Sequence, residues 1–222
     1  MLKSFFFVPA NNAKFIDKSK GINADYIVFD IEDAVLGQEI ELCFSNLSLL
    51  EIADNHFVRF RFFDAKNNLN DNDFNRLLGM GFHKFIIPKF SGLCQAEIIR
   101  DFIEKTGYSK NLTFCLLLED PFGLLSVYET LQKNIIPVFA IGLGSHDYCN
   151  SIGMKHTQAN LYFAKQMILN HAKAFNALAL DTVSVNIGDD QEFIDESLTG
   201  FNMGFDGKFV IHPQQVRLLK EI

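Results

Sequence analysis

The stretch Thr113-Phe114-Cys115-Leu116-Leu117-Leu118-Glu119 is an almost wholly apolar run of strand length that ends in a carboxylate. A run that is apolar on both faces is typical of a parallel strand covered on both sides. The stretch Val138-Phe139-Ala140-Ile141-Gly142-Leu143-Gly144 repeats the pattern, and Asp147 follows it three residues later. A turn and a helical pattern come after each run. The two segments therefore predict successive strand–helix units of a parallel α/β fold.

Six more segments of the same kind bring the number of predicted strands to eight. They are Ser4–Pro9, Tyr26–Glu32, Phe57–Phe62, Lys84–Phe90, Asp181–Ile187 and Phe209–His212. Between the strands, apolar residues at three- and four-residue spacing predict helices over Ala13–Lys20, Asp73–Met80, Gln95–Lys105, Gly123–Lys133 and Ala159–Phe175. Eight alternations with no linker favour a closed (β/α)8 TIM barrel, formed as a single domain by residues 1–222, over an open doubly wound sheet.

The composition limits the classes of function. The 222 residues are 48% hydrophobic, which suffices for a large core, and the net charge of −7 without a basic stripe argues against binding nucleic acid or an anionic membrane. No apolar run is long enough to cross a membrane or to form a signal peptide. The four cysteines form no CxxC pair, which predicts reduced and mostly buried thiols of a cytoplasmic protein rather than a catalytic thiol.

Polar residues gather where the predicted strands end, which is where barrel enzymes place their catalytic groups. These residues are Asn11, Asn12, Asp30, Glu32, Asp33, Arg59, Arg61, Lys89, Glu119, Asp147, Asn186 and His212. Carboxylates at the ends of successive strands can converge on one hard cation, and Mg²⁺ prefers oxygen ligands. The sequence therefore predicts a metal site at which Glu119 and Asp147 are the leading ligands.

The segment Asp30-Ile31-Glu32-Asp33-Ala34-Val35 places three carboxylates within four positions. Taken alone, these are ordinary solvated acids with an N-cap for the next helix. Beside Glu119 and Asp147, however, five carboxylates would crowd one barrel mouth and repel one another. A metal ion and an arginine are the simplest compensation.

The basic candidates at the mouth each have two interpretations. Arg59 and Arg61 lie two residues apart and should share one face of their strand, where they either pair with the carboxylates or clamp a substrate carboxylate. Lys89 can neutralise the acids or hold a phosphate, whereas the nearby acids disfavour a Schiff-base role. His146, beside Asp147, is either a base or incidental. His212-Pro213 either fixes the last turn or belongs to the site.

The motifs resemble those of the HpcH/HpaI aldolase superfamily, on the branch of the citrate lyase β-subunit and malyl-CoA lyase-like proteins. The resemblance covers nearly the whole chain. It is carried by Phe7-Val8-Pro9, Phe29-Asp30-Ile31-Glu32-Asp33-Ala34-Val35, Val58-Arg59, Ile87-Pro88-Lys89, Glu119, Leu143-Gly144-x-x-Asp147 and Gly204-Phe205-Asp206-Gly207-Lys208-x-x-Ile211-His212-Pro213-x-Gln215.

The resemblance implies a Mg²⁺-dependent carbon–carbon lyase on a TIM barrel, assembled as a homo-oligomer, either a trimer or a hexamer. Glu119 and Asp147 would ligate the metal, and Glu32 and Asp33 would bind its waters. Arg59 would hold a 2-oxo acid, helped by backbone N–H groups near Gly144 and Ser145 and by Lys89. Such a site polarises the oxo group and stabilises the alkoxide or enolate that develops during cleavage.

The chain also departs from the family pattern. The first loop reads Pro9-Ala10-Asn11-Asn12-Ala13 and lacks the arginine that helps to hold CoA. Asp120, His146, Ser151 and Lys165 stand where other residue types are usual. Only nine residues follow Pro213, so we expect no C-terminal segment of the kind that supplies a catalytic Asp to the neighbouring subunit. Proton transfer would then fall to His146, to a carboxylate or to metal-bound water.

Three functional hypotheses follow. The first is a lyase that cleaves or forms a small hydroxy acid, free or as an acyl-CoA thioester, with a 2-oxo acid such as glyoxylate, pyruvate or oxaloacetate as product or co-substrate. The second is an inactive relative that binds a metal and an oxo acid as a sensor or as a subunit of a complex. The third is phosphoenolpyruvate-type chemistry on the same barrel, which Lys89 and the arginines would permit.

Overall fold

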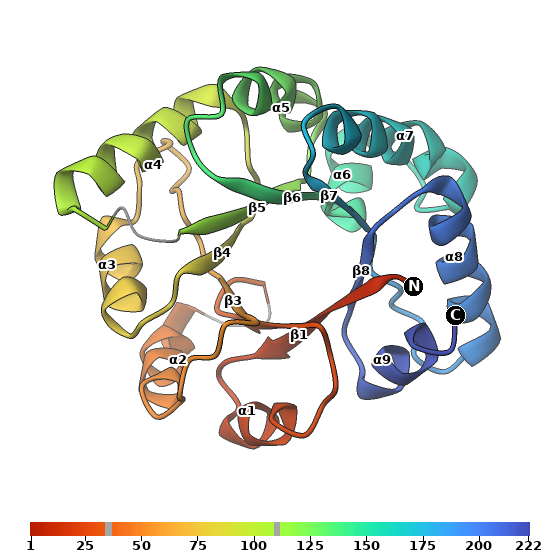
Figure 1. Cartoon of the computed structure of the whole chain (residues 1–222), viewed down its shortest axis with the longest axis horizontal. Helices are drawn as coiled ribbons and strands as arrows, with labels where there is room; N and C mark the ends of the chain where they lie inside the picture. The colour runs from red at the N-terminus through yellow and green to blue at the C-terminus, as the bar shows by residue number, and fades with distance from the viewer. Residues whose placement is uncertain (34–36, 109–111) are drawn as a thin grey trace.

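Eight parallel strands form a closed barrel in the order β1 to β8, with helices on the outside (Figure 1). The computed structural model describes residues 1–33, 37–108 and 112–222, so Ala34 and Val35 of the acidic motif lie outside the described residues. The strands are β1 Lys3–Pro9, β2 Tyr26–Asp30, β3 His56–Arg59, β4 Lys84–Ile87, β5 Thr113–Leu118, β6 Val138–Leu143, β7 Leu178–Asp181 and β8 Gly207–Val210. Pairing of β1 with β8 closes the barrel. The prediction of a (β/α)8 barrel is confirmed.

The described helices surround the barrel as a ring (Figure 1). They are α1 Ala13–Ser19, α2 Ile40–Leu47 with the preceding 3₁₀ turn η1 Gly37–Glu39, α3 Asp71–Gly79, α4 Leu93–Thr106, α5 Pro121–Lys133, α6 Ser145–Ile152, α7 Gln158–Ala174, α8 Asp190–Met203 and α9 Pro213–Leu219. Among the described residues, none of the helices has the length and apolarity needed to cross a bilayer.

Two apolar layers hold the barrel together. The interior is filled by a small cluster that includes Phe5, Phe57, Leu117 and Phe209, with the Phe5 and Phe57 rings 5.8 Å apart. A much larger cluster lies between the strands and the helices. The abundant phenylalanines serve both layers, because large rings fill the wide spaces on each side of a parallel sheet.

Short polar signals begin the helices that carry the site. Asp120 accepts a hydrogen bond from the backbone N–H of Gly123 at 2.7 Å, and Pro121 occupies the first helical position of α5. Asp120 therefore caps a helix. His212 likewise accepts from the N–H of Gln214 at the start of α9, which favours the structural interpretation of His212-Pro213.

Strand β7 differs from its prediction. We expected a strand over Asp181–Ile187, but β7 ends at Asp181, and residues beyond it leave the barrel ladder. Beyond Asp181, backbone carbonyls accept hydrogen bonds from side chains. Lys208 donates to the carbonyl of Thr182 and Gln215 donates to that of Ser184, both at 2.8 Å. The polar–apolar alternation after Asp181 therefore belongs to an extended loop.

The ends of β3 and β8 also differ from their predictions. β3 ends at Arg59, where the Arg59 carbonyl accepts a bond from the N–H of Ile31, and β8 begins two residues earlier than expected. Arg61 is consequently past the strand and exposed, and it does not share the site-facing side of β3 with Arg59.

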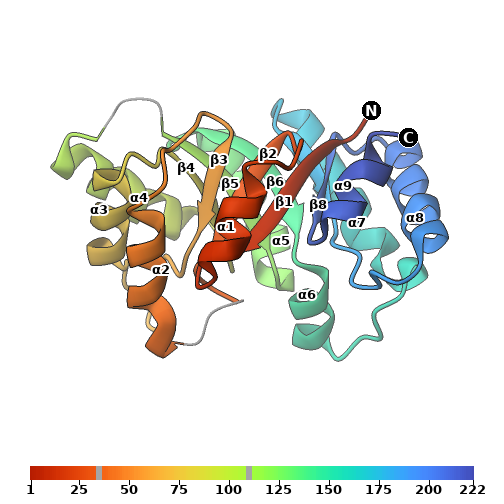
Figure 2. The ribbon, with the colours of Figure 1, turned by 90° about the horizontal axis from the view of Figure 1, so that it is seen from below.

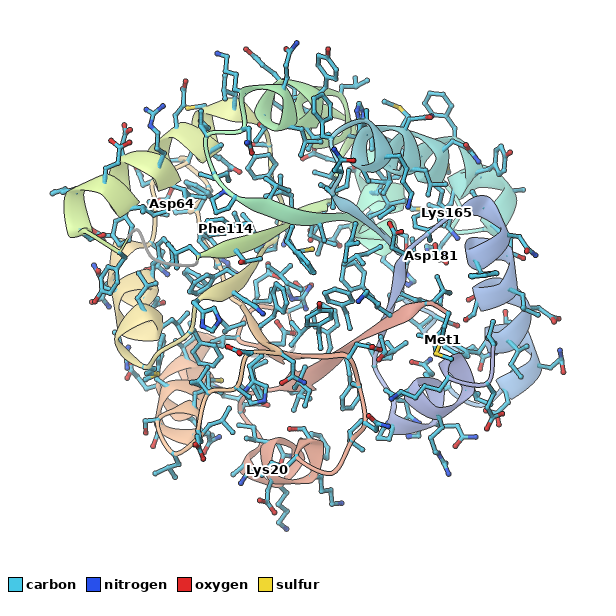
Figure 3. The ribbon with its side chains drawn as sticks, in the orientation of Figure 1. Met1, Lys20, Asp64, Phe114, Lys165 and Asp181 are labelled. Carbon is cyan, nitrogen blue, oxygen red and sulfur yellow. The ribbon has the colours of Figure 1, made fainter. Side chains whose placement is uncertain are left out.

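A charged group is buried between the barrel and its helices. Asp181 at the end of β7 lies 2.8 Å from the ammonium of Lys165 on α7 and 3.3 Å from that of Lys208 on β8. Figure 3 shows Lys165 and Asp181 side by side between α7 and the sheet. All three side chains are almost completely buried, and the two lysines hold the pKa of the Asp181 carboxyl below its ordinary value. Removing one member would leave a buried charge without its partner, which is strongly destabilising.

Candidate active site

The carboxyl ends of the strands surround a cavity of about 360 Å³. In Figure 2 this end carries α6 and lies opposite the two chain termini. The lining residues are Phe7, Pro9, Asp30, Asp33, Arg59, Leu117, Glu119, Leu143, Gly144, Ser145, His146, Asp147, Val183, Phe209 and Ile211. Residues from at least six strands or their following loops thus meet in one space.

Glu119 follows β5 directly and is buried below the cavity surface, with 4% of the residue exposed. The side chain of Glu119 packs directly on the backbone of Gly144, where a Cβ would come within 2.5 Å of the Glu119 Cγ. Position 144 therefore requires a glycine. Burial first, and then repulsion from Glu32, raises the pKa of the Glu119 carboxyl to about 8. Its Oε2 atom is buried and has no hydrogen-bond partner among the described residues. A buried carboxylate oxygen without a partner is suited to a cation.

Asp147 lies in the first turn of α6 and half of its side chain is exposed. The proximity of Asp147 contributes to the raised pKa of the Glu119 carboxyl, so the two predicted metal ligands are close together. Within the described residues, no cluster of three or more His, Cys, Asp or Glu side chains has the arrangement of a complete metal site. Mg²⁺ usually keeps several of its waters, so two protein carboxylates are enough to bind it, and water and substrate can fill the remaining coordination positions.

Arg59 at the end of β3 joins the acidic residues of the neighbouring strand. Its Nε and Nη2 donate to the two oxygens of Asp30 at 2.8 and 2.7 Å, and its Nη1 donates to Asp33 at 3.0 Å. Glu32 lies further away, at 3.7 Å. These acids raise the pKa of the guanidinium despite its burial, so Arg59 stays charged.

Lys89 connects the acidic groups across the mouth. Its ammonium donates to Glu32 at 3.1 Å and lies 3.7 Å from Asp147. Burial works against its charge, but the surrounding acids outweigh this and raise the pKa of Lys89. Its backbone has a φ of 50°, a conformation that few non-glycine residues adopt. Such backbone strain persists where the surrounding structure enforces it, and this often happens at functional sites.

His146 and Ser145 occupy the first turn of α6. The ring of His146 stacks on that of His156 with the centroids 4.1 Å apart, and its buried Nε2 has no hydrogen-bond partner in the part of the chain that the structure describes. His156 in turn lies 2.9 Å from the Ser145 hydroxyl. The N–H of Gly144 donates to the carbonyl of Leu118. The N–H groups of Ser145, His146 and Asp147, in the first turn of α6, precede the first intrahelical bond and can donate to a ligand.

Several predicted residues lie elsewhere. Asn12 caps α1, and the side chain of Asn11 donates to Glu39. Asn186, on the loop beyond β7, is exposed and donates to Glu192 in the first turn of α8. Arg61 lines a second, smaller cavity, formed by the segments after β2 and β3 together with η1, α2 and the start of α3. A polar residue just past a predicted strand is thus only a candidate, because many such residues cap helices or hold loops.

Two contributors to the cavity, Phe7 and Phe209, were missed when the site residues were chosen from the sequence. Asp30 appeared among the strand-end acids, but its two-point bond to Arg59 was not foreseen. Phe7 and Phe209 line the cavity, with the guanidinium carbon of Arg59 4.8 Å from the centre of the Phe7 ring. The period-2 pattern of β1 and β8 could have placed both rings inside the barrel.

A closed parallel barrel with charged residues gathered at the carboxyl ends of its strands is the arrangement of an α/β barrel enzyme. Residues 3–213 match the model of the HpcH/HpaI aldolase/citrate lyase family, and the chain belongs to this family.

Similar proteins agree with this assignment. The chain is 29% identical to citrate lyase subunit beta of Haemophilus influenzae, over 99% of this chain and 79% of that one. It is 27% identical to the mitochondrial citramalyl-CoA lyase of Homo sapiens, over 99% of this chain and 70% of that one. A structure of the citrate lyase beta subunit of Mycobacterium tuberculosis, complexed with oxaloacetate and magnesium, shares the fold with a TM-score of 0.83 at 20% identity, over 99% and 96% of the two chains.

The predicted family, fold and enzyme class are confirmed by these findings: the chain is a carbon–carbon lyase of the citrate lyase β-like type. The alternative of an inactive sensor or complex subunit is not favoured, because the named relatives are lyases.

Proposed function

We propose that this protein is a Mg²⁺-dependent lyase that cleaves or forms a carbon–carbon bond in a small hydroxy acid or its acyl-CoA thioester. A 2-oxo acid would be the product or co-substrate. The observation that carries the proposal is the meeting of Glu119, Asp147 and Arg59 around one small cavity in a chain of this family. The magnesium in the M. tuberculosis structure supports the choice of metal.

Glu119 and Asp147 would hold the metal ion. The donor set fits, because both groups supply oxygen, the Oε2 of Glu119 is buried without a partner, and a cation would relieve the repulsion that raises the pKa of Glu119. When bound, the ion supplies a Lewis acid that polarises a carbonyl oxygen. Glu32 and Asp33 would orient its waters, while Lys89 holds Glu32 in place.

Arg59 would bind the oxo acid and stabilise negative charge on its carbonyl oxygen. The guanidinium is fixed by Asp30 and Asp33 before any substrate arrives, so little reorganisation is needed when charge develops. The free N–H groups at the start of α6 and the ammonium of Lys89 would receive the carboxylate, as helix N-termini commonly do.

His146 is our candidate for proton transfer to or from the carbon that leaves or attacks. It lines the cavity, and its Nε2, although buried, has no hydrogen-bond partner among the described residues. Stacking against His156 fixes the ring. A general acid or base must lie within hydrogen-bond reach of its proton, and the cavity position of His146 satisfies this first requirement.

The direct test is calorimetry with glyoxylate, pyruvate and oxaloacetate, with and without Mg²⁺. The proposal expects at least one acid to bind only when Mg²⁺ is present. The acid that binds most tightly is then used in condensation and cleavage assays. In these assays the second substrate is supplied either as the free acid or as its CoA thioester, and the two rates are compared. Absence of binding under both conditions would overturn the proposal.

We further propose that the chain assembles as a homo-oligomer, a trimer or a hexamer. Phe122 and Leu125 on α5 and Phe163 on the adjacent α7 are each about two-thirds exposed, which is unusual for large apolar side chains. A second copy of the chain would cover them. Light scattering of the wild type and of Leu125→Glu tests this, because a monomeric wild type would refute it. All four cysteines are free, which supports the predicted cytoplasmic location.

A further inference from the structure

The cavity has two unlike sides. The carboxylates, Arg59 and the start of α6 form one side, contributed by β2, β3, β5 and β6. The opposite side belongs to β1, β8 and the loop after β7. It consists of Phe7, Pro9, Val183, Phe209 and Ile211, which we call the apolar wall. A substrate held by its oxo-acid end on the first side must direct its other end toward this wall.

The apolar wall is held in place by packing. The ring of Phe209 lies 5.5 Å from that of Phe7 and rests on Gly142, where a Cβ would come within 2.6 Å of it. Phe7 is in turn covered by the guanidinium of Arg59. Phe209 is 3% exposed, so it has little room to move aside. The wall is therefore a fixed surface and would not yield easily to a charged group.

The residues of the apolar wall carry no charge of their own, and the guanidinium of Arg59 approaches the wall at Phe7. Among the described residues that line the cavity, Arg59 is the only one with a permanent positive charge, and its nitrogens already bond to Asp30 and Asp33. Lys89 lies on the acidic side, bonded to Glu32. A second substrate carboxylate would thus face hydrocarbon, which is costly for a charge, whereas a hydrocarbon arm would gain about 25 cal/mol for each Å² buried.

We propose that the apolar wall selects oxo acids by their second substituent: a short hydrocarbon arm is accepted and a second carboxylate is rejected. The inference rests on the proposed function and specifies its substrate class. The cavity volume of about 360 Å³ lies at the lower end of the range for ligand pockets, which suits an acid of a few carbons. Ile211, which is 40% exposed at the rim, is the residue where the chemistry of the wall can be changed without disturbing the core.

The experiment compares 2-oxobutyrate with oxaloacetate, which differ only by a methyl group in place of a carboxylate. Both are titrated calorimetrically into the full chain at saturating free Mg²⁺, together with pyruvate as a reference. We expect 2-oxobutyrate to bind about fourfold more tightly than pyruvate, from about 0.8 kcal/mol for one buried CH₂ group. Oxaloacetate should bind at least tenfold more weakly than 2-oxobutyrate.

Ile211→Lys supplies the missing cation and should reverse the order, so that oxaloacetate becomes the tighter ligand. Leu49→Lys adds the same charge at an 86% exposed position just beyond α2 and should leave the order unchanged. If oxaloacetate matches or exceeds 2-oxobutyrate in the wild type, the inference is overturned while the proposed function stands. If no acid binds with Mg²⁺, the proposed function fails and the inference falls with it.

Discussion

The carboxyl group of Glu119 should destabilise the metal-free protein at alkaline pH. In the folded chain, burial and the neighbouring acids raise its pKa from 4.5 to about 8, with Glu32 as the strongest of those acids. In the unfolded chain, the same group ionises near its ordinary value. The folded state therefore loses stability as the pH rises from about 4.5, and the loss stops growing above about 8.

The magnitude follows from the displacement of the pKa. The difference between 8 and 4.5 is about 3.5 units, and each unit corresponds to about 1.4 kcal/mol, which sets an upper limit of about 5 kcal/mol. Glu119→Gln removes the charge and keeps the size and shape of the side chain. At pH 8.5 we expect the metal-free variant to be about 2 to 5 kcal/mol more stable than the wild type. At pH 5 the gain should fall below about 1 kcal/mol.

The assay is urea unfolding in EDTA at pH 5 and pH 8.5, repeated with excess Mg²⁺. The metal should stabilise the wild type, because it binds only the folded state, and should have little effect on the variant. Glu129→Gln is the matched control, since Glu129 is an exposed residue of α5 paired with Lys133. A Glu119→Gln variant that is less stable than the wild type in EDTA at pH 8.5, or that gains as much from Mg²⁺, would refute the reasoning.

Three other predictions concern the same mouth. Asp147→Asn should weaken Mg²⁺ binding at least tenfold in calorimetry and leave the far-UV circular dichroism unchanged; unaltered affinity would remove Asp147 from the ligand set. Arg59→Lys loses the two-point bond to Asp30 and should lower oxo-acid affinity more than Mg²⁺ affinity, whereas equal losses would mark Arg59 as a structural counter-ion. Because Glu119 must ionise to bind the metal, Mg²⁺ affinity should rise about tenfold per pH unit below about 8 and then level off. Calorimetry at pH 7 should show about one proton released for each ion bound. A flat affinity profile from pH 6 to 8 would contradict the raised pKa of Glu119.

The sequence was sufficient for the architecture because parallel strands bury both faces. Runs such as Thr113–Leu118 and Val138–Leu143 have no polar face, and their alternation with helices leaves few topologies open. Where the apolar run was shorter, its bounds were wrong. Leu178–Asp181 forms the seventh strand with only four residues, and the alternating segment that follows it looked more like a strand than the strand itself.

The sequence predicted which residues meet at the mouth of the barrel, but it did not predict how their side chains pair. Strand ends in a parallel barrel must converge, so Glu119, Asp147, Arg59 and Lys89 could be placed at one mouth. Pairing within the mouth depends on side-chain geometry that no pattern contains. The bond from Arg59 to Asp30 and the left-handed backbone of Lys89 are of this kind.

The buried Lys165–Asp181–Lys208 group shows a different limit. Each residue alone looks like an ordinary surface charge, and only the tertiary structure shows that α7, β7 and β8 bring them together away from water. A charge within an apolar strand, such as Asp181, is the signal that could have indicated a buried partner.

The charge balance of the mouth connects metal binding to substrate choice. With Glu119 ionised, as metal binding requires, Asp30, Glu32, Asp33, Glu119 and Asp147 carry five formal negative charges against two positive charges on Arg59 and Lys89, a sum of −3. An anionic acid entering this field alone would be repelled. A divalent cation brings the sum to −1, after which a monocarboxylate raises the negative charge to −2 and a dicarboxylate returns it to −3. The metal must therefore bind before the acid. The acid that adds the least negative charge is one whose second end is uncharged. An uncharged arm of this kind is also the group that the apolar wall can bury.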